Sequence, residues 1–168
     1  SAANSLVGSK ANDNVGAWSV LPIANGNYVV SSYKWDNGAM ADVGAVTWAN
    51  GSTGITGTIS AANSLIGSTA GDQIGSRFTY ALSNGNYIIG SPEWDNGAVA
   101  NVGAVTWVDG TTGLVGTISA ANSLIGTNTD DKVGITIAPL TNGNYVVSTL
   151  GWDNGAVANV GAVTWGSG

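Results

Sequence analysis

One segment of the chain occurs three times with few changes. Its first copy reads "NGNYVVSSYKWDNGAMADVGAVTW", and the copies occupy residues 25–48, 84–107 and 142–165. A fixed period of this kind is typical of repeat architectures, in which each copy is one supersecondary unit that packs on its neighbours. We therefore predict a single repeat array, divided into residues 1–59, 60–118 and 119–168.

Each repeat contains four short runs rich in β-branched and aromatic residues. In the first repeat they read "SAANSLVGS", "AWSVLPI", "NYVVSS" and "GAVTW", with Gly, Asn, Asp and Ser between them. This pattern is typical of strands joined by turns, and four strands per unit is the count of a propeller blade. We predict an all-β fold of three four-stranded antiparallel β-propeller blades, with a β-solenoid as the alternative.

Two features of the runs predict local structure. The "NGN" before the third run predicts a type I′ hairpin turn, because Asn and Gly both accept the positive φ that this turn demands. In the last run, alternation places Val46 and Trp48 on one face and Ala45 and Thr47 on the other. The tryptophans of this run are therefore expected in the core, and they are Trp48, Trp107 and Trp165. The second run varies between copies, and we expect it to line the centre of the assembly.

The composition argues against an enzyme. The chain has no His and no Cys, so it lacks the residues of a Ser-His-Asp triad, a cysteine nucleophile or an ordinary zinc site. A glycosidase needs two carboxyl groups in different environments, yet Glu93 is the only Glu and its counterparts are Lys34 and Gly151. We expect no catalytic residues and no cofactor.

Charge and hydropathy limit the partners of the chain. With 10 acidic and 4 basic side chains and a net charge of −6, a nucleic-acid partner is not expected, because phosphate binding requires clustered basic residues. No apolar run approaches the roughly 20 residues that span a bilayer, so membrane insertion is not expected either. Few charges, 26 Gly and many Asn, Ser and Thr favour an extracellular or cell-surface location.

The order of motifs resembles the FG-GAP or integrin-type β-propeller blade across the whole chain. "GDQIG" at 71–75, "NGNYIIGSP" at 84–92 and "DNGAVANVGAVTW" at 95–107 follow the order of that blade. The chain is also similar to near-identical repeats in large bacterial surface proteins of the filamentous-haemagglutinin type, and this resemblance implies an adhesive function. Calcium-binding blades carry acidic ligands in the hairpin, whereas this chain has "IANGN", "LSNGN" and "LTNGN" there. No metal site is therefore expected.

A loop carboxylate recurs in each repeat, at Asp13, Asp72 and Asp131. Such a carboxylate either accepts hydrogen bonds from backbone N–H groups in a turn or contributes to a metal site. We favour the turn, because a loop carboxylate more often has this role.

The motif "WDN" also recurs once in each repeat. An aromatic face beside carboxylate and amide groups suits a pyranose ring. The other interpretation, which we favour, is a Trp that packs between blades over an Asx-turn. The candidate ligand-binding residues are Trp35, Asp36, Asn37, Trp94, Asp95, Asn96, Trp152, Asp153 and Asn154.

The sequence starts and stops out of phase with the blade. The resemblance implies that "SAANSLVGS" is the fourth strand of a blade, so residues 60–68 would complete the first blade and residues 119–127 the second. Residues 1–9 are then left to complete the third. Because three blades are too few to close a ring, we expect residues 1–9 to pair with residues 161–165 of another copy. The result would be a two-chain ring or an open chain of subunits.

These observations predict a non-enzymatic extracellular module for adhesion or surface assembly, which associates with copies of itself through its N-terminal strand. The alternative is a carbohydrate-binding, lectin-like propeller with sites at the Trp-Asp-Asn loops. The expected partners are other copies of the chain and, in the alternative, surface glycans.

Overall fold

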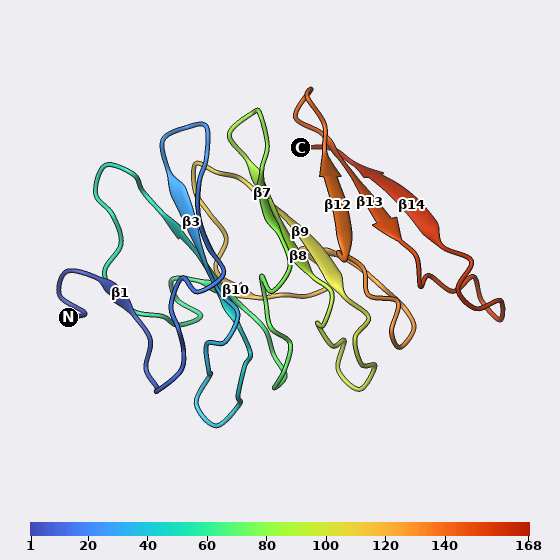
Figure 1. Cartoon of the computed structure of the whole chain (residues 1–168), viewed down its shortest axis with the longest axis horizontal. Helices are drawn as coiled ribbons and strands as arrows, with labels where there is room; N and C mark the ends of the chain where they lie inside the picture. The colour runs from blue at the N-terminus through green and yellow to red at the C-terminus, as the bar shows by residue number, and fades with distance from the viewer.

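The protein consists of β-strands and turns. The computed structural model describes all residues from 1 to 168 and contains fourteen short strands. Figure 1 shows three sheets that follow one another along the long axis of the molecule. The prediction of an all-β fold is confirmed. The chain contains no helix that is long and apolar enough to cross a membrane.

The first sheet is built from the first two repeats. Its antiparallel meander consists of β2 (Ser19–Pro22), β3 (Tyr28–Ser32) and β4 (Ala45–Ala49). Two short strands extend it: β6 (Leu65–Ile66) pairs with β4 in antiparallel orientation, and β10 (Gly116–Thr117) pairs with β6 in parallel. The strand order is β10-β6-β4-β3-β2.

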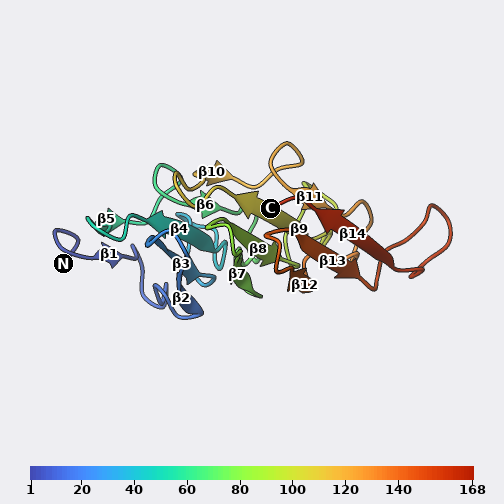
Figure 2. The same ribbon diagram turned by 90° about the horizontal axis from the view of Figure 1, so that it is seen from above.

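The other sheets repeat this plan with fewer strands. The second sheet has the order β11-β9-β8-β7, with strands β7 (Thr79–Ala81), β8 (Tyr87–Ser91), β9 (Ala104–Val108) and β11 (Leu124–Ile125). The third sheet contains only β12 (Thr136–Pro139), β13 (Tyr145–Thr149) and β14 (Ala162–Gly166). A separate parallel pair is formed by β1 (Leu6–Val7) and β5 (Gly57–Thr58). Figure 2 shows this pair and the third sheet at opposite ends of the row.

The hairpin turns differ from the predicted type I′. Ile23 N donates a hydrogen bond to Asn27 O, and Gly26 N donates one to Ile23 O. Only Gly26 has a positive φ, of 87°, so the loop is a type I turn followed by a glycine in the left-handed region. The type I′ prediction is therefore wrong. The loop has three residues, and Asn25 instead uses its side chain to accept a hydrogen bond from Asn27 N.

The hydrophobic core lies between successive sheets, because each meander is covered by its neighbour. Val46 of the first sheet and Ile89 of the second belong to one cluster of 12 buried residues. On the opposite face of β8, Ile88 joins Val147 of the third sheet in a second cluster. All five residues of β8 are buried as a result. The second sheet is thus the middle layer of a stack.

The tryptophans of the "GAVTW" runs are not all in the core. Trp48 is covered by the second repeat: its Nε1 donates a hydrogen bond to Gly110 O at 2.8 Å, and Gly113 leaves room for the ring, since a Cβ there would lie 2.6 Å from Trp48 Cβ. Trp107 is 37% exposed and Trp165 is 60% exposed. The core prediction is therefore wrong for Trp107 and Trp165, whose side chains lie partly or mostly in solvent.

Candidate assembly site

The last strand of each meander is completed by a short strand from the following repeat. Ala45 and Val46 of β4 pair with Ile66 and Leu65 of β6, and β9 pairs with β11 in the same register. The prediction that the following repeat supplies the fourth strand is confirmed for the first two sheets. In the third sheet, β14 has β13 on one side and no strand on the other.

The free edge leaves apolar side chains of β14 in solvent. Val46 and Val105 are each 1% exposed, whereas Val163, which occupies the same position in the third repeat, is 75% exposed. Trp165 on the same face is 60% exposed. A strand with unpaired backbone groups and exposed apolar side chains is a template for the addition of another strand.

A pair of buried hydroxyl groups joins the third and fourth strands of the completed sheets. Thr47 Oγ1 and Ser64 Oγ lie 2.6 Å apart, and the second sheet has the equivalent pair at 2.7 Å. Thr164 occupies this position in β14 but is exposed. The serine that corresponds to Ser64 in the first repeat is Ser5.

A pocket of about 60 Å³ lies beneath the free edge, between the second and third sheets. Its lining is mostly apolar and consists of Leu124, Ile125, Val133, Thr149, Trp152, Ala162 and Thr164. At the equivalent place one sheet earlier, Ile118 and Ile125 join Trp94 in the core cluster. The pocket is thus the space that a fourth-strand side chain would occupy beside Trp152.

The N-terminal pair corresponds to β6 and β10 without the rest of their sheet. Leu6 pairs with Gly57 and Val7 with Thr58 in parallel, and β6 pairs with β10 in the same way. No antiparallel strand lies on the other side of β1. Both residues of β1 are half-buried, whereas both residues of β6 are buried. Within one chain, residues 1–9 therefore do not complete the third sheet.

Comparison with known protein families identifies the repeated unit. The segments that match one family model are residues 1–17, 22–76, 81–135 and 139–168, and the family is described as a repeat of unknown function (DUF5650). The chain belongs to the DUF5650 repeat family. A search of curated proteins found no match to it.

The Trp-Asp-Asn loop of each DUF5650 repeat follows the middle strand of its own three-stranded meander, so the nine candidate residues form three separate groups. Trp35 and Trp94 are 3% and 2% exposed, whereas Trp152 is half-buried and lines the pocket. In each loop the aspartate accepts a hydrogen bond, through one carboxylate oxygen, from the backbone N–H group six residues later. These aspartates are Asp36, Asp95 and Asp153. The asparagines that exchange two backbone hydrogen bonds with the residue three positions on are Asn37, Asn96 and Asn154. Sugar binding at these loops stays a prediction.

The repeated loop aspartates cap backbone N–H groups, as the sequence predicts. Asp72 Oδ2 accepts hydrogen bonds from the N–H groups of Ser68 and Thr69 at 2.7 and 2.8 Å, and Oδ1 accepts one from Asp95 N at 3.0 Å. The other two DUF5650 repeats have the equivalent bonds. Burial raises the pKa of Asp72, and the three N–H donors act in the opposite direction.

Four aromatic residues outside the repeated motifs were not predicted to form a site. They are Trp18, Tyr33, Phe78 and Tyr80, and their rings lie next to one another. The sequence does contain a signal for these four residues: they are the aromatic residues that do not recur in all three DUF5650 repeats.

Proposed function

We propose that this chain is a non-enzymatic module of an extracellular or cell-surface assembly, serving adhesion or the building of that assembly, and that its copies join by strand addition. One observation carries the proposal. The chain holds a three-stranded sheet with an open edge and, at the other end of the row, a fourth strand without its sheet. In the assembly, β1 of one copy adds to β14 of another.

The register of the junction follows from the two junctions within the chain. Transferred to β14, that register sets Leu6 of the second copy opposite Val163 and Val7 opposite Ala162. Val7 then faces the pocket beside Trp152. Since β5 stays paired with β1, the completed sheet has five strands, the number found in the first sheet.

Burial of exposed side chains would stabilise this junction. Val163 and Trp165 are mostly exposed in the single chain, and full burial of one such apolar side chain contributes roughly 1.5–3 kcal/mol. A hydrogen bond between Ser5 and Thr164 would reproduce the buried hydroxyl pair of the internal junctions. Such a bond favours one register, because a slip of one residue would turn the apolar side chains to the opposite face.

The junction joins two different surfaces and is therefore head-to-tail. Such contacts close into a ring if the rotation between subunits permits, and otherwise give an open row. The FG-GAP-like interpretation is part of this proposal, with each sheet as one blade. Two copies would then supply six blades, which lies within the usual range of 4 to 8.

The experiment is light scattering on the full chain and on a chain lacking residues 1–9, at micromolar concentration. We expect the full chain to form dimers or larger assemblies and the truncated chain to be monomeric. Hydrogen exchange should show the first two sheets protected in both chains, and β14 protected only in the full chain. A monodisperse full-length monomer with protected amides in β14 would contradict strand addition between copies.

Carbohydrate binding at the Trp-Asp-Asn loops is the second candidate. It is favoured by Trp152, whose ring is only half-buried and borders an open pocket. The buried rings of Trp35 and Trp94 argue for packing at those two positions. Substitution of these tryptophans separates the two roles, as set out in the Discussion.

A further inference from the structure

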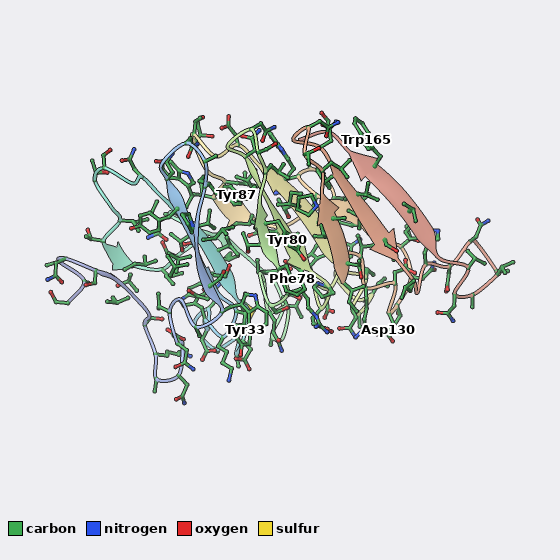
Figure 3. All side chains as sticks on the ribbon, turned by 45° about the horizontal axis from the view of Figure 1, so that its top comes forward. Tyr33, Phe78, Tyr80, Tyr87, Asp130 and Trp165 are labelled. Atoms are coloured by element: carbon green, nitrogen blue, oxygen red, sulfur yellow. The ribbon has the colours of Figure 1, made fainter.

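All aromatic residues that are not repeated along the chain meet at one place. Trp18 lies with its ring centroid 6.1 Å from that of Tyr33 and 6.4 Å from that of Phe78, and Phe78 lies 5.3 Å from Tyr80. We call these four residues the aromatic cluster. It crosses from the first sheet to the second beside β2 and β7. Figure 3 shows Tyr33, Phe78 and Tyr80 near one another and well away from Trp165.

The repeat fold does not require these rings. At the position of Tyr33, the other two repeats have Pro92 and Leu150. At the position of Phe78, the first repeat has Ser19. The DUF5650 matches also leave gaps at residues 18–21, 77–80 and 136–138, which include three of the four cluster residues. The other repeats form the same strands without these rings, so the strands do not depend on the cluster.

The rings at the centre of the cluster are accessible. Trp18 is 44% exposed and Phe78 is 45% exposed. They meet at an interplanar angle of 61°, and Trp18 meets Tyr33 at 80°. The exposure of Trp18 and Phe78 leaves part of each ring accessible to a ligand.

Two basic residues are sequence neighbours of the aromatic cluster. Lys34 Nζ lies 5.8 Å from the centroid of the Tyr33 ring, and Arg77 is exposed and directly precedes Phe78. Neither takes part in the two ion pairs of the chain. Lys34 and Arg77 are two of only four basic side chains in a protein with a net charge of −6.

We propose that the aromatic cluster binds an acidic polysaccharide, that is, a chain of uronic acid residues. Aromatic faces pack against the C–H face of a pyranose ring, while Lys34 and Arg77 supply cations for its carboxylates. An acidic ligand is favoured over a neutral sugar because its carboxylates can form charge-assisted hydrogen bonds with these basic side chains. The cluster lies apart from β14, so this proposal does not rest on the proposed assembly.

The test is isothermal titration of the full chain with an oligogalacturonate and with a neutral cello-oligosaccharide of equal length. The variants are Trp18→Ala and Phe78→Ser, the second of which inserts the residue that the first repeat has at this position. Each should weaken binding of the oligogalacturonate by about tenfold. The matched control is Trp107→Ala, a Trp that is 37% exposed and lies outside both the cluster and the proposed junction, and it should bind the ligand like the parent chain.

The double variant Lys34→Gln, Arg77→Gln tests the charge requirement. It should weaken binding of the oligogalacturonate, and added salt should have less effect on its affinity than on that of the parent chain. Thermal unfolding verifies that each variant is folded. Equal affinity for the neutral sugar, an unchanged affinity of the Trp18 and Phe78 variants, or absence of binding to the oligogalacturonate would each overturn the proposal.

Discussion

Asp72 Oδ1 accepts a hydrogen bond from the backbone N–H of Asp95 at 3.0 Å, although 23 residues separate them in the chain. Through its other oxygen, the same carboxylate binds the N–H groups of Ser68 and Thr69, directly after the fourth strand of the first sheet. One buried side chain thus links that strand to the Trp-Asp-Asn loop of the next sheet. Gly67 permits this approach, since a Cβ there would lie 2.7 Å from Asp72 Cβ.

The buried carboxyl of Asp72 should make stability depend on pH. Burial raises its pKa above the ordinary value of 3.8, so between these two pKa values the folded chain holds more protons than the unfolded chain. The free energy of unfolding contributed by Asp72 is then greatest below pH 3.8 and falls as the pH rises through the raised pKa. Urea unfolding at several pH values measures the difference in the free energy of unfolding between the parent chain and Asp72→Asn. This difference, parent minus variant, should fall as the pH rises. A difference that grows with pH would contradict this.

Asp109 serves as a control of opposite sign. Hydrogen bonds from the Thr111 side chain and then its backbone N–H lower the pKa of Asp109. Its contribution to stability is present above pH 3.8 and is lost as the pH falls through the lowered pKa. The stability of the parent chain minus that of Asp109→Asn should therefore rise with pH over the interval between the two pKa values.

Replacing Val163 by Lys should prevent association without unfolding the chain. Val163 is 75% exposed in the single chain, so the new charge stays solvated, while a Lys on a strand edge opposes pairing. Val105→Lys is the matched internal variant. Because Val105 is 1% exposed, this change buries an unpaired charge and should destabilise the fold by several kcal/mol. Light scattering and urea unfolding measure the two effects. Continued association of the Val163 variant would exclude β14 as the junction.

The hydroxyl pair between the third and fourth strands should contribute modestly to stability. Thr47→Val removes one partner but leaves Ser64 Oγ its hydrogen bond to Asn63 Oδ1, at 3.0 Å. We expect a loss of about 1 kcal/mol in urea unfolding. Thr164→Val should leave the stability of the monomer unchanged and weaken only association. A loss of monomer stability from Thr164→Val equal to that from Thr47→Val would show that Thr164 already has a partner within the chain.

The two roles considered for the Trp-Asp-Asn loops predict different results for Trp94→Ala and Trp152→Ala. If the tryptophans pack, Trp94→Ala should cost about 3–5 kcal/mol, and Trp152→Ala should cost less because Trp152 is less buried than Trp94. If they bind sugar, both variants should remain folded and lose binding on a glycan array. Near-UV circular dichroism, read beside the array, separates these outcomes. An unfolded Trp94 variant would favour packing.

Much of the fold follows from the sequence because the relevant signals are local. The runs that became β3, β4 and β6 were recognisable from β-branched residues between turn residues. The resemblance to the FG-GAP blade implies which segment completes which sheet, and the pairing of β4 with β6 agrees with it. The capping role of Asp72 was predicted in the same way, because an aspartate in a turn finds its N–H donors within a few residues.

Turn type and burial were decided by tertiary structure. Asn25 does not adopt the positive φ that a type I′ turn requires, because the hydrogen bond between Ile23 and Asn27 sets the length of the loop at three residues. Val46 and Val163 lie in the same "GAVTW" motif, yet one is buried and the other is 75% exposed. A strand motif determines how the strand pairs and toward which face of the sheet each side chain points. The burial of those side chains depends on whether another strand or sheet covers them.

The aromatic cluster shows the same limit at longer range. Trp18 and Phe78 lie in different repeats, in runs that share little sequence, and their rings meet only because β2 and β7 lie side by side in the stack. The sequence by itself determined the repeat and the strands, and its resemblance to the FG-GAP blade implied the order in which repeats complete each other's sheets. Stacking of the sheets decided which side chains meet and which remain open to a partner, because such contacts join residues that no local pattern connects.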